Sequence, residues 1–338
     1  MKAISYHRYG SPDVLTCEEI AKPAPAVDEV LIKVRAAAVN PYDWHFMRGE
    51  PYFVRIAAGG LRKPKDSRLG ADVAGEIEAV GKNVTQFKTG DGVFGICKGA
   101  FAEYACATES ALVMKPDNVT FEQAASVPIA AFTALQGLRD KGHIQPGQKV
   151  LINGAAGGVG TFAVQIAKSF GAEVTGVCST RNVELVRSIG ADHVVDYTQE
   201  DFTKSARRYD AILDCVGNHS FSECRRVLNP RGIYVGAGGT TDNWMIGPLT
   251  RAIKALVLSW FVSQKQVMVL AKPSKGDLTI MHDLMKAGKV TPVIDRSYSL
   301  PDVPEAIRYL EAGHARGKVV ITVDRNKDTY ETAAPDRY

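Results

Sequence analysis

A glycine-rich turn is the first feature of this sequence that could bind a ligand. Residues 154–160 read Gly-Ala-Ala-Gly-Gly-Val-Gly, between a strand-like run at 149–153 and an amphipathic, helix-like run. Glycines let a pyrophosphate approach the backbone, and the N-terminus of the following helix offers free N–H groups with partial positive charge. We therefore expect a dinucleotide at this turn; the alternative is a turn that serves packing alone. The candidate phosphate-binding residues are Ala155, Gly157, Gly158 and Val159.

The next strand-like run, at 173–178, is followed by residues suited to a second phosphate. An acidic residue at this strand end would accept hydrogen bonds from the ribose 2′-hydroxyl of NAD, and none is present. Ser179 can donate to phosphate oxygens, and Arg181 offers a planar cationic fork. The segment favours NADP(H), with Ser179 and Arg181 at its 2′-phosphate; the alternative is that Arg181 is an exposed residue at a helix start.

Small residues follow two later strand-like runs, at 210–216 and 232–236. Ligands of open α/β sheets lie beyond the carboxyl ends of the strands. These residues would therefore border the nicotinamide half of the cofactor, unless they form ordinary turns. The candidates are Val216, Gly236 and Gly238.

The pattern of predicted strands and helices changes near residue 126. Before it, short strand-like runs such as 74–80 are separated by Gly, Pro, Asn and Asp. After it, strands and helices alternate, which predicts right-handed crossovers and a doubly wound parallel sheet in an α/β fold. From residue 271 the pattern is mixed again, and it closes on a strand-like run at 318–323.

Composition excludes several classes of protein. The 338 residues, 45% hydrophobic and 23% charged, predict a globular chain of about two domains. A net charge of +4 from dispersed residues is too mild for a nucleic-acid partner. Six scattered cysteines without C-x-x-C spacing favour neither a disulfide framework nor a zinc ribbon. No apolar run reaches the roughly 20 residues that span a bilayer, and the N-terminus lacks a signal-peptide core, so we expect a cytoplasmic protein.

Ordered motifs along nearly the whole chain carry a resemblance. They read AVNPYDW at 38–44, LGADVAG at 69–75, VG at 80–81, FKTGD at 87–91, GAFAEY at 99–104, FTAL at 132–135, the glycine turn, and GKVV at 317–320. With these motifs the chain resembles the medium-chain dehydrogenase/reductase superfamily, in its zinc-free quinone oxidoreductase (zeta-crystallin-like) and enoyl reductase branch. The resemblance implies a GroES-like catalytic domain at 1–125 and 271–338, an inserted Rossmann NADP(H)-binding domain at 126–270, and an active site in the cleft between them.

Two departures from the zinc alcohol dehydrogenases of that superfamily concern the metal. Where those relatives carry Gly-His-Glu, this chain has Gly70-Ala71-Asp72, which removes an imidazole ligand. The four clustered cysteines of their structural zinc lobe are also missing. His45 is the one histidine in the catalytic-looking motif, and a lone histidine is typical of a surface or packing position. We therefore expect no metal.

Without a metal, positioned donors must stabilise the enolate charge that builds while hydride from NADPH reduces a quinone or an α,β-unsaturated ketone. The resemblance implies that Asn40 lies near the nicotinamide, with Trp44 as an apolar wall. It also implies a proton-donating tyrosine about a dozen residues further on. Tyr52 lies close to that spacing, and the alternative is a half-buried loop aromatic. Three further residues match positions that contact cofactor phosphate or ribose in relatives: Thr133, Tyr197 and Lys318. The alternative for each is a packing or surface role.

The leading hypothesis is a zinc-independent, NADPH-dependent reductase of small lipophilic quinones or α,β-unsaturated carbonyl compounds. The alternative is an NADPH-binding sensor or structural protein with little turnover. The resemblance also implies a homodimer. An apolar stripe at 249–262 predicts a helix that lies in the core or contacts another subunit. The alternatives are a hydrophobic wall for the substrate and a surface that contacts a membrane.

Overall fold

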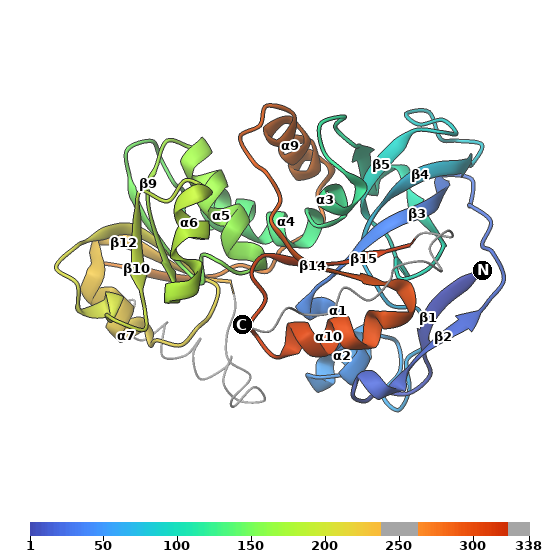
Figure 1. The fold of residues 1–338 in the computed structure, drawn as a ribbon, viewed down its shortest axis with the longest axis horizontal. Coiled ribbons are helices and arrows are strands. Elements are labelled where there is room, and N and C mark those ends of the chain that lie inside the picture. The colour runs from blue at the N-terminus through green and yellow to red at the C-terminus, as the bar shows by residue number, and fades with distance from the viewer. Residues whose placement is uncertain (238–262, 324–338) are drawn as a thin grey trace, which may run out of the picture.

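Two large β-sheets organise the chain in a computed structural model, which describes residues 1–237 and 263–323 (Figure 1). One sheet has six strands and the other has seven, and they lie at opposite ends of the long axis of the molecule. Gly238 and the predicted helix at 249–262 lie outside the described residues.

The seven-stranded sheet joins the first third of the chain to its C-terminal part. Its strands are β3 (Glu29–Val39), β4 (Asp72–Val80), β5 (Gly92–Ile96), β6 (Tyr104–Thr108), β7 (Leu112–Met114), β14 (Ile294–Ser299) and β15 (Lys318–Thr322). Their order is β14-β15-β3-β4-β5-β7, with β6 also paired to β3. β15 runs antiparallel to β3, so a late strand returns beside an early one. Beside this sheet, β1 (Lys2–Tyr6) and β2 (Leu15–Glu19) form a small antiparallel pair.

The six-stranded sheet is parallel throughout, as the alternation of strands and helices predicts. Its strands are β8 (Lys149–Asn153), β9 (Glu173–Cys178), β10 (His193–Asp196), β11 (Tyr209–Asp214), β12 (Leu228–Gly236) and β13 (Lys265–Met268). Their order is β10-β9-β8-β11-β12-β13. The reversal of strand order beside β8 is the switch point at which α/β sheets bind ligands. The predicted α/β fold class, with a β-rich sheet and a doubly wound parallel sheet, is confirmed.

Helices connect and cover the strands. The α-helices are α1 (Pro41–Arg48), α2 (Tyr52–Ala57), α3 (Phe121–Ala125), α4 (Pro128–Gln136), α5 (Gly158–Ser169), α6 (Val183–Ser188), α7 (Phe221–Cys224), α9 (Lys275–Lys286) and α10 (Val303–Glu311). Short 3-10 turns lie at Pro12–Val14, Glu109–Ala111, Thr180–Asn182, Phe202–Lys204, Arg225–Val227 and Leu300–Asp302, and a π-helical turn at Gly137–Lys141 extends α4. Within the described residues no helix is long and apolar enough to cross a bilayer.

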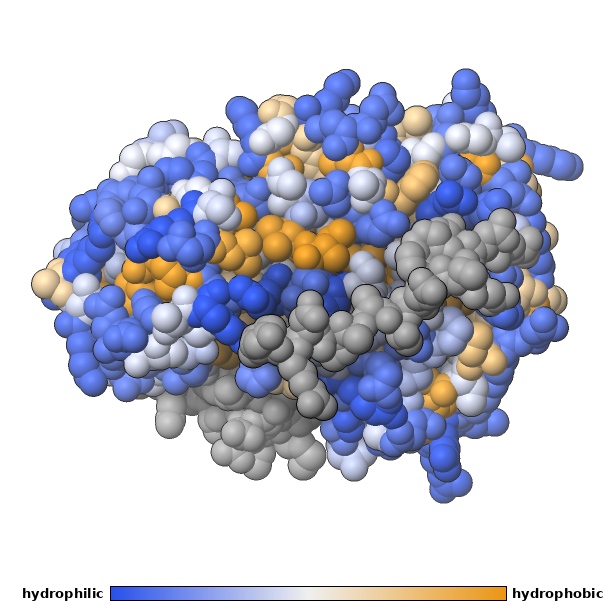
Figure 2. Space-filling view, viewed as in Figure 1, coloured by the Kyte–Doolittle hydropathy of each residue, from blue (hydrophilic) through white to orange (hydrophobic). Residues whose placement is uncertain are grey.

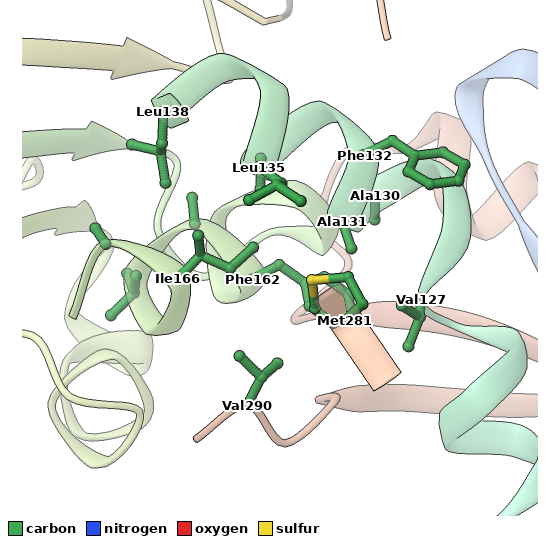
Figure 3. Packing of buried hydrophobic residues seen from close by; sticks show 14 of the residues in the cluster. Val127, Ala130, Ala131, Phe132, Leu135, Leu138, Phe162, Ile166, Met281 and Val290 are labelled. Carbon is green, nitrogen blue, oxygen red and sulfur yellow. The ribbon is translucent and has the colours of Figure 1, made fainter. Parts of the chain in front are cut away.

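One hydrophobic cluster ties the two sheets together through α4, α5 and α9. Leu135 of α4 points toward Phe162 of α5, and Met281 of α9 lies beside them (Figure 3). All three side chains are at most 1% exposed, and each contributes roughly 1.5–3 kcal/mol by burial. On the surface, hydrophobic residues gather in the middle of one face, over the region of α4 and α5 (Figure 2). The cluster crosses the predicted domain limits at residues 125 and 270, and the position of those limits stays a prediction.

Candidate active site

The glycine-rich turn joins the end of β8 to the start of α5, where the sequence places it. Gly154 has a φ of 83°, in the left-handed region, and a Cβ on Gly160 would lie 2.0 Å from the Gly154 carbonyl oxygen. The turn therefore folds back so tightly that only glycine fits there. Around Gly157 an added Cβ would meet nothing closer than 3.4 Å, so the outer side of the turn has room for a phosphate.

The predicted phosphate-binding residues of this turn differ in whether their backbone N–H groups are free to bind an anion. The N–H of Ala155 donates to the Val177 carbonyl, and the N–H of Gly157 donates to the Gly154 carbonyl. Gly158 and Val159 lie in the first turn of α5, where N–H groups have no acceptor inside the helix. These two N–H groups are the ones that fit an anion.

Lys318, at the start of β15, lies against this helix N-terminus. A Cβ on Gly158 would be 3.2 Å from Lys318 Cδ, so the lysine stem packs beside the turn. The side chain is almost fully buried, and its Nζ donates to Asn40 Oδ1 at 2.5 Å. The structure thus brings together Lys318, a predicted cofactor residue, and Asn40, a predicted catalytic residue.

Two buried carboxylates complete the surroundings of this lysine. Asp72 Oδ2 lies 3.6 Å from Lys318 Nζ and accepts from Asn40 Nδ2 at 2.9 Å. Its other oxygen accepts from the N–H of Ile129 in the first turn of α4. Asp43 Oδ2 accepts from the N–H of Asn40 at 2.7 Å, while Asp43 Oδ1 makes no hydrogen bond within the described part of the chain. Lys318, Asn40, Asp43 and Asp72 are named the buried polar cluster below.

Burial governs ionisation in the buried polar cluster. It raises the pKa of Asp43 to about 8; the N–H of Asn40 opposes this shift, and the charge of Asp72 adds to it. Burial also raises the pKa of Asp72, against the attraction of Lys318, and lowers the pKa of Lys318, against the attraction of Asp72. A neutral Asp43 beside an ionised Asp72–Lys318 pair leaves the cluster without net charge.

Arginines from two distant segments meet at the end of β9. Arg181 is exposed, and its guanidinium approaches the His314 carbonyl at 3.4 Å. Arg316 donates to Asn182 Oδ1 at 2.7 Å and to the Arg181 carbonyl at 2.9 Å. The predicted Ser179 accepts from Asn182 Nδ2 at 3.2 Å. Sequence patterns do not reveal Arg316, because its 135-residue separation from Arg181 is closed only by the fold.

A carboxylate that the sequence analysis does not predict lies at the end of the neighbouring strand. Asp196 accepts from Thr180 Oγ1 at 2.6 Å and from the N–H and hydroxyl of Thr198. The hydrogen bond from Thr180 is the largest cause of the lowered pKa of Asp196. Asp196 is thus already bonded to threonines, and a second carboxylate beside the arginines, Asp295, accepts from the N–H of Arg316 and from the Tyr309 hydroxyl.

The other predicted cofactor residues lie at several places around the six-stranded sheet. Val216 lies over the glycine turn, since a Cβ on Gly154 would be 2.7 Å from its Cγ2. Tyr197 is exposed and donates its N–H to the Cys178 carbonyl, beside the end of β9. Gly236 ends β12. Thr133, within α4, donates its hydroxyl to the Ile129 carbonyl.

An apolar cavity of about 620 Å³ lies next to the buried polar cluster. Its described lining is mostly apolar and includes Tyr42, Phe46, Leu69, Ala71, Ile129 and Phe132, while the charged residues Glu29, Asp66, Arg68 and Lys98 line another part of the wall. Tyr42 and Phe46 are one helical turn apart on α1, and their ring centroids lie 4.4 Å apart. Ala71 and Asp72 are neighbours in the chain, so the cavity and the cluster share a wall.

The predicted catalytic residues are outside the described lining of this cavity. Trp44 stacks on His45 with ring centroids 3.7 Å apart and packs against the core of the seven-stranded sheet. Tyr52 is 61% exposed on α2, where Arg55 lies 4.7 Å from its ring centroid. Asn40 is buried beneath the cavity wall. The catalytic roles of these three residues stay predictions, whereas the cavity adds Tyr42, which the spacing of the motif does not single out.

The donor set does not fit a zinc ion. Residues 1–237 and 263–323 contain no group of three or more His, Cys, Asp or Glu side chains arranged to hold a metal. Ala71 carries no donor, and His45 Nδ1 hydrogen-bonds to the Glu50 carbonyl at 2.8 Å.

Comparisons with known proteins agree with this geometry. The model of the alcohol dehydrogenase GroES-like domain matches residues 26–117, and that of the zinc-binding dehydrogenase matches residues 189–321. The chloroplast envelope quinone oxidoreductase homolog of Arabidopsis thaliana is 34% identical, over 95% of this chain and 98% of that protein. A 2-methylene-furan-3-one reductase of Solanum lycopersicum is 36% identical, over 95% and 79%. The solved quinone oxidoreductase of Coxiella burnetii superposes with a TM-score of 0.82 at 31% identity, over 96% and 99%.

The raised pKa of Asp43 predicts a pH-dependent stability that D43N removes. A carboxyl group whose folded pKa is about 8 binds its proton more tightly in the folded state than in the unfolded chain. Its contribution to the free energy of unfolding therefore decreases between about pH 4 and pH 8, by at most about 1.4 kcal/mol per pH unit. In urea unfolding at pH 6, 7 and 8, D43N should gain stability relative to the unsubstituted chain as pH rises.

The matched control is Asp13→Asn, which changes an exposed carboxylate paired with Arg308. The pKa of Asp13 is lowered, so its substitution should leave the pH profile unchanged over this range. Parallel profiles for D43N and the unsubstituted chain would contradict the assignment.

Proposed function

Since the chain belongs to the medium-chain dehydrogenase/reductase superfamily, in its quinone oxidoreductase branch, we propose that it reduces quinones or α,β-unsaturated carbonyl compounds with NADPH and without zinc. It is an oxidoreductase; the substrate class, the choice of NADPH and the independence from metal are the proposal. The observation that carries it is the buried contact of Lys318 with Asn40. Through this contact, the glycine turn at the N-terminus of α5, which has room for a phosphate, is connected to the wall of an apolar cavity.

The polar side of the site fits the anionic groups of a dinucleotide, which when bound supplies the hydride. The N–H groups of Gly158 and Val159, with the ammonium of Lys318, would bind the pyrophosphate. Arg181 and Arg316 would bind the 2′-phosphate through their planar guanidinium groups. Asp196 is bonded to Thr180 and Thr198, so the arginines give this end of the site its preference for NADPH.

The apolar side of the site fits a small lipophilic carbonyl compound. Tyr42, Phe46, Ile129 and Phe132 line the cavity, so a substrate bound against them would displace water, which strengthens any hydrogen bond made to the substrate oxygen. Burial raises the pKa of Tyr42, so its hydroxyl is protonated at neutral pH. That hydroxyl can therefore stabilise the charge that builds on the substrate oxygen, or supply a proton there.

Asn40 acts on the position of Lys318. Its amide oxygen accepts from Lys318, and its amide nitrogen donates to Asp72 and to the Ala38 carbonyl. With these bonds made, Asn40 is a positioning residue that fixes the ammonium of Lys318 between itself and Asp72, while the lysine stem packs beside the helix N-terminus. The same side chain links the cofactor turn to the cavity wall, which supports the predicted location of Asn40 near the nicotinamide.

The relatives support both substrate classes. One is named for quinone reduction and another for reduction of a furanone that bears a conjugated alkene. The domain division at 1–125 with 271–338 and 126–270, the homodimer and the cytoplasmic location remain part of the proposal.

Purified chain should oxidise NADPH in the presence of at least one acceptor from a panel of benzoquinones, naphthoquinones and enones. Elemental analysis should find no stoichiometric zinc, and a chelator should leave the rate unchanged. Product analysis then separates quinone reduction from alkene saturation. Binding of NADPH without oxidation by any acceptor would favour a sensor or structural protein, and chelator-sensitive turnover would exclude the zinc-free mechanism.

A pair of conservative tyrosine variants separates the two candidate proton donors. Tyr42→Phe removes a hydroxyl that lines the cavity, and we expect kcat to fall by roughly 100-fold with little change in KM. Tyr52→Phe removes a hydroxyl from an exposed ring and should leave kcat within about twofold. Steady-state kinetics with the best acceptor measures both variants. The reverse order of effects would restore Tyr52 as the donor.

The proposed 2′-phosphate site is tested by comparing the two cofactors. Arg181→Ala should raise the Kd of NADPH about 10-fold or more, because a charge-assisted bond is lost, and should leave the Kd of NADH unchanged. Arg187→Ala is the matched control, since Arg187 is also exposed but pairs with Glu184 on α6. Titration by fluorescence gives the Kd of each cofactor for the unsubstituted chain and for both variants. Equal effects of Arg181→Ala on NADPH and NADH would contradict the assignment.

A further inference from the structure

α2 and the loop after it carry large apolar side chains that the proposed chemistry does not use. Ile56 is 71% exposed and Leu61 is 66% exposed, and Tyr52 and Phe53 on the same short helix are exposed to a similar degree. Arg55 Nη1 donates to the Leu61 carbonyl, so the loop lies directly beside α2. Residues 52–65 are named the α2 surface below.

All charged side chains of the α2 surface are positive. Residues 52–65 contain Arg55, Arg62, Lys63 and Lys65 and no acidic residue. Arg62, Lys63 and Lys65 are exposed, and none of the three forms an ion pair with a described residue. The next carboxylate along the chain, Asp66, is already paired with Arg68 and Lys98. The surface therefore offers exposed cations beside exposed apolar side chains.

The α2 surface is held in one arrangement by contacts with the rest of the fold. The hydroxyl of Tyr9 donates to the Gly60 carbonyl at 2.6 Å. Arg55 stacks over the Tyr9 ring at 4.7 Å and donates to the Gly49 carbonyl at 2.9 Å. Docking of an ordered surface loses less conformational entropy than docking of a mobile loop.

The substrate cavity lies beside the α2 surface. Ala57, the last residue of α2, and Ala58 both line the cavity, together with Tyr42 of the preceding helix. Figure 1 places α1 and α2 next to each other near the lower margin of the molecule. A molecule that reaches the α2 surface is therefore close to the space in which reduction is proposed.

We propose that the α2 surface docks on an anionic lipid bilayer and places the cavity beside the membrane interface. Aromatic and aliphatic side chains flanked by lysine and arginine bind at the boundary between headgroups and acyl chains. The described helices do not cross a bilayer, so this attachment is peripheral. A bilayer satisfies both halves of the surface at once, because its phosphates pair with the cations while its acyl region receives Ile56 and Leu61. The delivery of a lipophilic quinone or enone from the bilayer to the cavity rests on the proposed function, whereas the docking itself does not.

Co-sedimentation of the full chain with vesicles tests the docking. The chain should bind vesicles of phosphatidylcholine with about one-third phosphatidylserine, and should bind pure phosphatidylcholine vesicles far more weakly. The variant R62Q/K63Q/K65Q should lower partitioning into the mixed vesicles by about 100-fold, at roughly fivefold per cation. The variant I56S/L61S should lower it by about 10-fold, because less apolar area is buried.

The matched control is K141Q/K286Q/K289Q, which removes the same charge from exposed lysines on other elements and should bind as the unsubstituted chain does. Failure of the unsubstituted chain to bind the mixed vesicles, or equal loss in both lysine-containing triple variants, would overturn the proposal. Retention on immobilised polyglutamate without binding to vesicles would also overturn it, in favour of an acidic protein partner. Turnover of a water-soluble quinone without vesicles is measured in parallel; its absence would bear on the proposed function and leave the docking result intact.

Discussion

The buried ammonium of Lys318 is the contact on which the candidate site depends. A charge in that position is tolerated because Asn40 accepts from it and Asp72 lies 3.6 Å away. Asp72 is held in turn by the N–H of Ile129, at the start of the helix that packs on α5. Removing one partner of a buried ion pair costs about 3–5 kcal/mol. The pairing of β15 with β3, the placement of α4 and the geometry of the glycine turn are thus coupled through one side chain.

The buried polar cluster also separates two chemical environments. Successive residues of an extended strand point to opposite sides, and Ala71 faces the cavity while Asp72 faces Lys318. An alanine at this position leaves an apolar wall in the place where zinc-dependent relatives carry an imidazole. In the proposed function, activation of a carbonyl compound therefore depends on hydrogen-bond donors such as the Tyr42 hydroxyl. A largely apolar surrounding makes such donors more effective than they are in water.

Local patterns predict the elements of this fold well and the contacts of its site less well. The runs at 149–153 and 173–178 coincide with β8 and β9, because a strand of the parallel sheet is a short apolar run. β13 is not predicted, since its four residues contain Lys265 and Gln266 and owe their strand conformation to pairing with β12. The bond between Lys318 and Asn40 spans 278 residues, and spacing carries no information on such a separation. Spacing also does not tell which way a side chain points. Tyr42 and Trp44 are only two residues apart on α1, yet Tyr42 lines the cavity while Trp44 packs against the core.

A crystal structure of the chain with NADPH tests the central claim most directly. The pyrophosphate should lie at the N-terminus of α5, within hydrogen-bonding distance of Lys318 Nζ, with the nicotinamide facing the cavity lined by Tyr42 and Phe132. The buried polar cluster should show no metal density beside Asp72. A dinucleotide bound elsewhere, with Lys318 making no contact to it, would contradict the account, and so would a metal ion coordinated by Asp72 or Asp43.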